Sequence, residues 1–267
     1  MSLPRRALAG LALLLVSCAP NTAAGPVPPA AAVPDTPGAP GAPGAPGAPA
    51  PAAPTPHPTA AAVAARPAPP ELPRRLPGIG PRLLAAVPAG TRQALVVTGD
   101  GPDASTGRAV LYRDDGTGWL AGPTWPTRNA LHGWTSDHHE GDLRSPIGVF
   151  TLGDAGGRLP DPGTRLPYDH TDDFSISGTG FAGEPLAGAF DFVVAIDYNR
   201  VPGASPLDRR RPRGGQYGGG IWLHVDHGGP THGCIGLTPD RMRELLLALD
   251  PALHPVVVMG DAPALAR

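Results

Sequence analysis

The sequence of 267 residues has no lysine, only two cysteines and no excess of positive charge. Its 21 basic residues are all arginine and stand against 23 acidic residues, so the formal net charge is −2 at pH 7. A chain with this balance is not expected to bind nucleic acid. The two cysteines, Cys18 and Cys234, are too far apart in the sequence for the paired spacing of structural zinc sites. The N-terminal apolar run, Ala7 to Val16, is too short to span a bilayer.

Proline and glycine are abundant, at 38 and 37 residues, and proline is concentrated in the N-terminal third. Residues 18–70 are rich in Ala and Pro and include a Gly-Ala-Pro repeat. Such a composition buries no core, so this stretch is predicted to be a disordered linker. Residues 71–92 are predicted to lead into a folded domain that spans residues 93–262.

Residues 1–17 have the features of a secretory leader, with Arg5 and Arg6 before the short apolar run. Leu15-Val16-Ser17-Cys18 resembles a bacterial lipobox, in which cleavage leaves the cysteine at the new N-terminus to carry a lipid. This predicts an extracytoplasmic protein anchored to the membrane through Cys18. The alternative is an ordinary signal peptide with an accidental cysteine. If Cys18 is lipidated, Cys234 is an unpaired thiol in an oxidising compartment and hence a candidate reactive group.

The rest of the chain predicts a mainly β domain with one clear helix. Asp115-Gly116 is typical of a hairpin turn, and a short helix is expected from Pro81 to Val87. Thr238 and Pro239 have the residue types of a helix N-cap and first turn. Strands are expected at 93–98, 109–112, 118–121, 190–198 and 255–259, and the helix after Cys234 has an apolar face of Met242, Leu245, Leu246 and Leu249.

The stretch from Ile221 to Leu237 places one thiol among three imidazoles. Cysteine attacks as a thiolate, and a neighbouring imidazole that accepts its proton makes it reactive. His224 ends a β-prone run and a Gly-Gly-Pro turn follows, so His224 and Cys234 are predicted to face each other. Because Gly233 has no side chain, a substrate carbonyl can approach the N–H groups of Gly233 and Cys234, which would serve as an oxyanion hole.

The signature Thr231-His232-Gly233-Cys234, preceded by His224, resembles that of the L,D-transpeptidases with a YkuD-type catalytic domain. Glu140 to Phe150, which includes Ser145-Pro146-Ile147-Gly148-Val149-Phe150, resembles that family's acidic-glycine and Thr/Ser-Pro-x-Gly-x-Phe segment. The resemblance covers roughly residues 93 to 260. It implies a two-sheet β-sandwich with a helix after the catalytic cysteine. The turn before Thr231 is shorter than in the best-known members, and Gly236 stands where they usually have Arg or Asn.

The resemblance also implies the roles of individual residues. Cys234 is the expected nucleophile, His224 its base, Gly233 part of the oxyanion hole and His232 a supporting group that competes with His224 on spacing alone. His227, in the turn, is expected to matter little. The residues expected to bind substrate are Thr231, Gly236, Arg144 and Tyr217.

The function implied is that of a monomeric L,D-transpeptidase of cell wall biogenesis and cell shape, which forms or exchanges peptidoglycan cross-links through a thioester on Cys234. Its partners would be stem peptides and, through Cys18, the membrane, and it would face the cell wall. With water as acceptor it would be an L,D-carboxypeptidase. A lipoprotein that binds wall peptides without catalysis stays an alternative, because Gly236 lacks the usual polar side chain.

Three further features of the sequence have to be interpreted. His224, His227, His232 and Cys234 could hold zinc, but the Ser-Pro-x-Gly-x-Phe match favours a thiol enzyme without metal or other cofactor. His138 and His139 are expected to be exposed loop histidines. The basic cluster Arg209, Arg210, Arg211 and Arg213 is expected to be a solvated loop, with contact to a wall polymer as the alternative.

Overall fold

The computed structural model describes residues 75–267. The predicted leader, Cys18 and the Ala/Pro-rich linker therefore lie outside the described residues. Nowhere in the described range is a helix long and apolar enough to cross a membrane.

The helices are short and the strands dominate. The helices are α1 (Pro81–Leu84), α2 (Pro239–Ala248) and α3 (Ala262–Leu265), with 3-10 turns η1 (Gly215–Tyr217) and η2 (Pro251–Leu253). The strands are β1 (Gln93–Gly99), β2 (Thr106–Asp114), β3 (Trp119–Arg128), β4 (Trp134–Thr135), β5 (Ser145–Pro146), β6 (Gly148–Thr151), β7 (Ala155–Gly157), β8 (Tyr168–His170), β9 (Val193–Ala195), β10 (Trp222–Val225), β11 (Ile235–Leu237) and β12 (Val256–Asp261).

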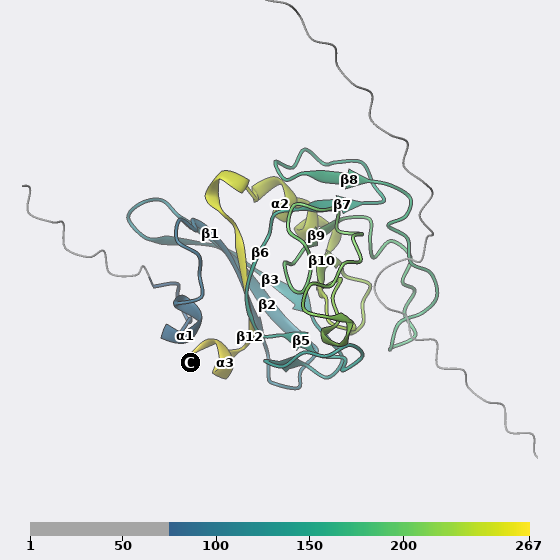
Figure 1. Cartoon of the computed structure of the whole chain (residues 1–267), viewed down its shortest axis with the longest axis horizontal. Coiled ribbons are helices and arrows are strands. Elements are labelled where there is room, and N and C mark those ends of the chain that lie inside the picture. Colours follow the sequence, from purple (N-terminus) through teal and green to yellow (C-terminus); the bar gives the residue numbers. More distant parts are fainter. Residues whose placement is uncertain (1–74) are drawn as a thin grey trace, which may run out of the picture. The chain divides into compact units, whose positions relative to one another are not determined.

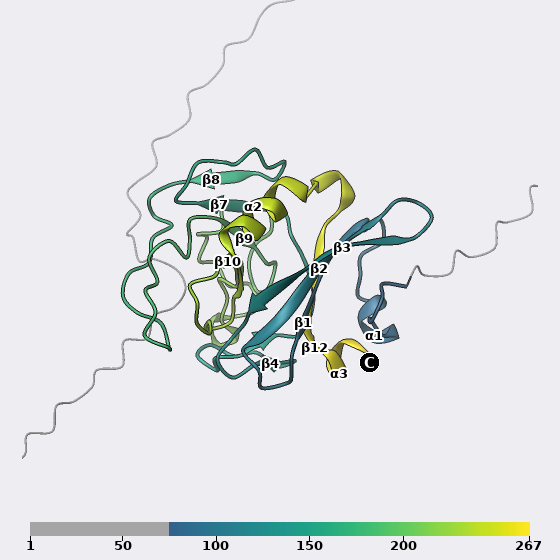
Figure 2. The same ribbon diagram turned by 180° about the vertical axis from the view of Figure 1, so that it is seen from behind.

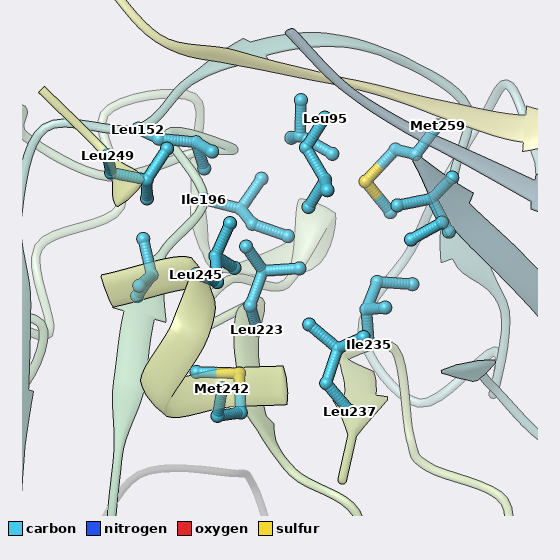
Figure 3. Packing of buried hydrophobic residues seen from close by; sticks show 14 of the residues in the cluster. Leu95, Leu152, Ile196, Leu223, Ile235, Leu237, Met242, Leu245, Leu249 and Met259 are labelled. Atoms are coloured by element: carbon cyan, nitrogen blue, oxygen red, sulfur yellow. The ribbon is translucent and has the colours of Figure 1, made fainter. Parts of the chain in front are cut away.

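Ten strands form one mixed sheet in the order β6-β12-β1-β2-β3-β11-β10-β9-β7-β8, while β4 and β5 form a separate pair. In Figures 1 and 2 the long strands β1, β2, β3 and β12 form one part of the domain and β7 to β10 another. Both halves of the sheet supply side chains to one core, among them Leu95 and Met259 from one half and Leu223 and Ile235 from the other (Figure 3). The fold is therefore mainly β and sandwich-like, as predicted.

The predicted hairpin is confirmed, and its turn shows why it forms there. Strands β2 and β3 pair in antiparallel register on either side of the turn. The side chain of Asp115 accepts hydrogen bonds from the N–H groups of Thr117 and Gly118. Gly116 has φ 100°, a left-handed conformation that glycine adopts without steric cost. Local sequence chemistry is sufficient to place this turn.

The helix after Cys234 is also confirmed as α2. It begins at Pro239, although the side chain of the preceding Thr238 makes no capping hydrogen bond. Its predicted apolar residues, Met242, Leu245, Leu246 and Leu249, are all fully buried. Figure 3 shows Met242 and Leu245 beside Leu223 of β10, so the helix packs against the strand that carries His224.

The strand predicted from Phe190 to Tyr198 is much shorter, because only Val193–Ala195 (β9) is in the ladder. Beyond it, Ile196 and Asp197 make single bonds to Ile221 and Thr151 instead of a continuing ladder. The chain then turns at Asn199, whose φ is 45°. Apolar residues on both sides of β9 are buried in loops, which a periodicity argument cannot distinguish from a buried strand.

Candidate active site

Two parallel strands bring His224 and Cys234 to one face of the sheet. Leu223 pairs with Ile235 and His224 with Gly236, so Cys234 lies beside Trp222 at the point where β11 begins. Side chains alternate along a strand, so those of Trp222, His224 and Cys234 point to the same face. The prediction that the thiol and this imidazole lie on one surface is therefore consistent with the strand register.

The sulfur of Cys234 is fully buried and contacts two main-chain groups. The N–H of Trp222 donates to Sγ at 3.4 Å, and Sγ lies 3.6 Å from the carbonyl oxygen of Gly220. A donor aimed at the sulfur favours the ionised thiolate, whereas the carbonyl can accept a hydrogen bond from the neutral thiol. The two contacts hold the sulfur in place in either protonation state.

His224 is held in the tautomer that a proton acceptor needs. Its Nδ1 lies 2.8 Å from the carbonyl oxygen of Val225. A carbonyl only accepts, so Nδ1 carries the hydrogen and Nε2 keeps a free lone pair. The ring packs edge-on against Phe190 and in parallel with the ring of His227, with centroids 5.6 and 5.7 Å away. Burial lowers the pKa of His224 from 6.5 to about 4, so the imidazole is neutral at pH 7.

The Gly233-Cys234 pair is fixed by two hydroxyl groups. Thr231 donates through Oγ1 to the carbonyl of Cys234 at 2.6 Å, and Ser145 donates through Oγ to the carbonyl of Gly233 at 2.9 Å. Ser145 also accepts from the N–H of Ala130 at 3.1 Å. Sequence reasoning did not select Ser145 as a site residue, although it belongs to the Ser-Pro-x-Gly-x-Phe segment. Both motifs therefore meet at the candidate nucleophile.

The surroundings of Gly233 are closely packed. A Cβ on Gly233 would lie 2.7 Å from Cδ1 of Ile221 and 3.7 Å from Cε1 of His138. A side chain at position 233 would require the Ile221 side chain to shift, so close packing favours glycine here. Its N–H makes no hydrogen bond within residues 75–267, which leaves it as a donor for a substrate oxygen.

A narrow apolar pocket opens beside His224. His224, Thr231 and His232 line it together with residues of the loop after β8 and of the turn after β10, namely Ile176, Gly180, Phe181, Leu186, Ala189, Phe190, His227 and Pro230. Its volume is about 30 Å³. That is room for about one or two water molecules and far too little for a peptide.

The loop residues 178–186 fold onto the turn that carries the histidines. Phe181 packs on His232 with ring centroids 4.7 Å apart. Glu184 Oε1 lies 3.0 Å from Nδ1 of His227, whose side chain is 7% exposed. A Cβ on Gly229 would fall 1.8 Å from Glu184 Oε1. Sequence reasoning missed Phe181 and Glu184, because nothing local in a Gly-rich loop shows where it folds back.

Three residues expected to bind substrate do not line this pocket. The side chain of Arg144 bonds to Asp103 and to the carbonyl of Trp134. The guanidinium of Arg213 lies over the ring of Tyr217, with its central carbon 4.7 Å from the ring centroid. Gly236 sits against Asp226, so that an added Cβ would lie 3.3 Å from the Asp226 Cα.

His138 is not the exposed loop histidine that was expected, because its side chain is only 5% exposed. Nδ1 lies 3.0 Å from Asp142 Oδ1, and the ring meets Tyr198 edge-on. Burial lowers the pKa of His138, and the Asp142 carboxylate opposes that shift. His139 is exposed, as expected.

The zinc alternative finds no support in the geometry. No group of three or more His, Cys, Asp or Glu side chains in the described part of the chain is arranged to hold a metal ion. His224 and His227 instead stack on each other, and His227 contacts Glu184.

Comparison with known proteins identifies a family. The family model for the YkuD L,D-transpeptidase catalytic domain matches residues 88–258. Among solved structures, the chain is similar to Bd1075 of Bdellovibrio bacteriovorus, at 15% sequence identity and a TM-score of 0.36 over 64% of this chain. The chain spans about half of that protein, 48% of its length. No curated protein matches the sequence.

Proposed function

Because the chain belongs to the YkuD L,D-transpeptidase catalytic-domain family, we propose that Cys234 is its nucleophile and is acylated by a peptidoglycan stem peptide. The observation that carries this proposal is the state of His224. Its Nδ1–H is tied to the Val225 carbonyl, and its Nε2 is available on the face that carries the sulfur. A thiol and an oriented neutral imidazole on one face of the sheet are the two groups that nucleophilic cysteine catalysis uses.

In the acylation step, the thiol proton passes to Nε2 of His224 and the sulfur attacks the carbonyl carbon after the L-centre of a stem tetrapeptide. The carbonyl oxygen takes up negative charge, which the N–H groups of Gly233 and Cys234 would stabilise. The C–N bond then breaks, and the terminal D-residue leaves as an amine with the proton from His224. A thioester on Cys234 remains.

In the second step an amine attacks the thioester and gives its proton to His224. The C–S bond breaks, the thiol regains that proton, and a new peptide bond forms a cross-link. If water attacks instead, the product is a shortened stem peptide and the activity is that of an L,D-carboxypeptidase. The ring of His232 lines the same pocket and would support substrate binding under Phe181.

One observation favours a second candidate, a protein that binds wall peptides without turnover. The side chain of Cys234 has no exposed surface, and the pocket beside His224 is too small for a peptide. Catalysis therefore requires the loop residues 178–186 to move away from His227 and His232. A binding protein could instead recognise peptides on the closed surface.

The test that separates these candidates is intact-mass analysis after exposure to a carbapenem, an acylating inhibitor, followed by peptide mapping. Wild type and the exposed-residue control His139→Ala should gain one acyl group on Cys234, and Cys234→Ala should gain none. Release of a D-residue from a stem tetrapeptide should follow the same pattern. Full turnover by Cys234→Ala would exclude the covalent mechanism. Peptide binding by a wild type that is never acylated would favour the second candidate.

The place of action is part of the proposal. We infer a lipid anchor on Cys18 from the lipobox-like residues, and an extended linker, residues 18–70, that carries the domain toward the wall. The domain is proposed to act there as a monomer.

A further inference from the structure

The basic cluster Arg209 to Arg213 does not form one solvated patch. Arg210 pairs with Asp208 through Nη2 at 2.5 Å. Arg213 lies over the rings of Tyr217 and Tyr198, 4.7 and 5.5 Å from their centroids. Arg211 differs from both, because it is partly buried and contacts neither a carboxylate nor an aromatic ring within residues 75–267.

Arg211 is held from one side only. Its Nη1 donates to the carbonyls of Asp208 and Arg210, at 3.1 and 3.0 Å. Nε and Nη2 make no hydrogen bond within the described range. These two nitrogens form the side edge of the guanidinium, which can bind both oxygens of a carboxylate at once.

The side chain lies along Gly219 and Gly220, and only glycine permits this. A Cβ on Gly219 would fall 2.2 Å from Nε of Arg211, and one on Gly220 would fall 3.3 Å from Nη2. Both glycines have positive φ, 152° and 67°. The carbonyl of the same Gly220 contacts the sulfur of Cys234 at 3.6 Å. One residue therefore lies between the guanidinium edge and the candidate nucleophile.

We propose that Arg211 binds the terminal carboxylate of the peptide that acylates Cys234, and so selects substrates that end in a free carboxylate one residue after the attacked bond. This inference rests on the proposed function. Arg211 would act as a specificity-determining residue, while His224 and Cys234 carry out the proton transfer and the attack.

The distances are compatible with this role. Gly220 connects the two groups: its Cβ position lies 3.3 Å from Nη2 of Arg211, and its carbonyl oxygen lies 3.6 Å from the sulfur of Cys234. Because these two points of Gly220 are about 3 Å apart, Nη2 and the sulfur are separated by at most roughly 10 Å. A carbonyl carbon in position for attack lies about 3 Å from the nucleophile. The next residue adds about 3.5 Å, and a charge-assisted hydrogen bond adds about 2.8 Å. A single residue beyond the attacked bond therefore reaches the guanidinium edge.

The electrostatic environment of Arg211 favours the binding of an anion. Burial lowers the pKa of Arg211, and the nearby carboxylate of Glu140 opposes this without forming an ion pair. A guanidinium that has lost water and has no carboxylate against it gains most from an anionic ligand. The competing interpretation is that Arg211 only holds its own loop together, through the bonds of Nη1 to Asp208 and Arg210.

The first experiment compares a stem tetrapeptide that ends in a free carboxylate with the same peptide ending in a carboxamide. Wild type should prefer the free acid in kcat/KM by about 10- to 100-fold. Arg211→Gln should lose this preference, mainly through KM, and Arg211→Lys should keep part of it. Arg210→Gln is the matched control and should behave as wild type. A preference that survives in Arg211→Gln overturns the proposal.

The second experiment does not depend on peptide turnover. Alkylation of Cys234 by anionic iodoacetate and by neutral iodoacetamide is compared by peptide mass spectrometry. Loss of a positive charge near the sulfur should lower the iodoacetate-to-iodoacetamide rate ratio by about threefold to tenfold in Arg211→Gln, but not in Arg211→Lys or Arg210→Gln. If the ratio falls while wild type turns over no stem peptide, the anion site stands and the proposed function fails. If peptides are turned over and the ratio is unchanged, the anion site fails.

Discussion

Acidification is expected to destabilise the domain through the imidazole of His224. This ring is buried, its Nδ1–H is satisfied by Val225, and burial lowers its pKa from 6.5 to about 4. In the unfolded chain the same imidazole would titrate near its ordinary value. Between these two pKa values the unfolded state binds the proton more readily than the folded state does, so protonation favours unfolding.

The sign and size of the effect follow from this pKa difference. The stabilisation by neutral His224 is complete above about pH 6.5 and is lost progressively as the pH falls toward about 4. A difference of about 2.5 pKa units corresponds to about 3 kcal/mol of unfolding free energy. For a small domain this is a large part of the total stability.

Urea unfolding at several values between about pH 7 and about pH 4 measures the effect. Wild type is compared with His224→Gln, which cannot titrate, and with His139→Gln, which removes an exposed imidazole. The slope of unfolding free energy against pH should be steep in wild type and in His139→Gln and much shallower in His224→Gln. His138, also buried, adds a smaller slope that all three proteins share. Equal slopes in wild type and His224→Gln would show that His224 is not held neutral by burial.

Four further predictions address the site and the N-terminal segment. His224→Ala should lower the rate of acylation by about a hundred- to ten-thousand-fold and His232→Ala by less; the pH dependence of Cys234 alkylation in each variant measures this, and the reverse order would assign the base to His232. Ser145→Ala leaves the Ala130 N–H and the Gly233 carbonyl without their partner and should cost about 2–3 kcal/mol in urea unfolding, whereas a loss below about 0.5 kcal/mol would show that water replaces the hydroxyl. Cys18→Ala should release the protein from membranes or block its processing, and identical partition of mutant and wild type in detergent extraction would rule out the lipid anchor. Deletion of residues 19–70 should leave the melting temperature unchanged, and a drop of several degrees would mean that the linker contributes to the fold.

The elements that depend on local chemistry could be predicted from the sequence. The Asp115-Gly116 turn, the strand that became β1 and the apolar face of α2 each arise from residues within a few positions of one another. The placement of His224 and Cys234 on one face of the sheet could be predicted for a similar reason, since a single turn joins them. The family resemblance singled out both the segment around Ser145 and the Gly233-Cys234 pair, which the structure joins through the Ser145–Gly233 hydrogen bond.

The features that sequence reasoning missed depend on distant parts of the chain. His138 is buried because Asp142 and Tyr198 enclose it, and Tyr198 is 60 residues away. The side chain of His227 is largely covered because Glu184 folds back from a loop without periodic apolar residues. The strand 190–198 was predicted too long because buried loop residues and buried strand residues look alike in sequence. Tertiary contacts decided each of these cases.

The pairing of the first and last strands has a consequence for the order of folding. β1 lies parallel to β12, with Ala94 opposite Val256, and β3 lies beside β11. The sheet therefore cannot close until nearly the whole domain is available, and contacts between such distant segments slow folding. During synthesis, Cys234 emerges before β12 does. The cluster that buries the thiol contains no residue of β12, so the thiol should become protected from oxidation once β9 and β10 pack around it, before the final strand docks.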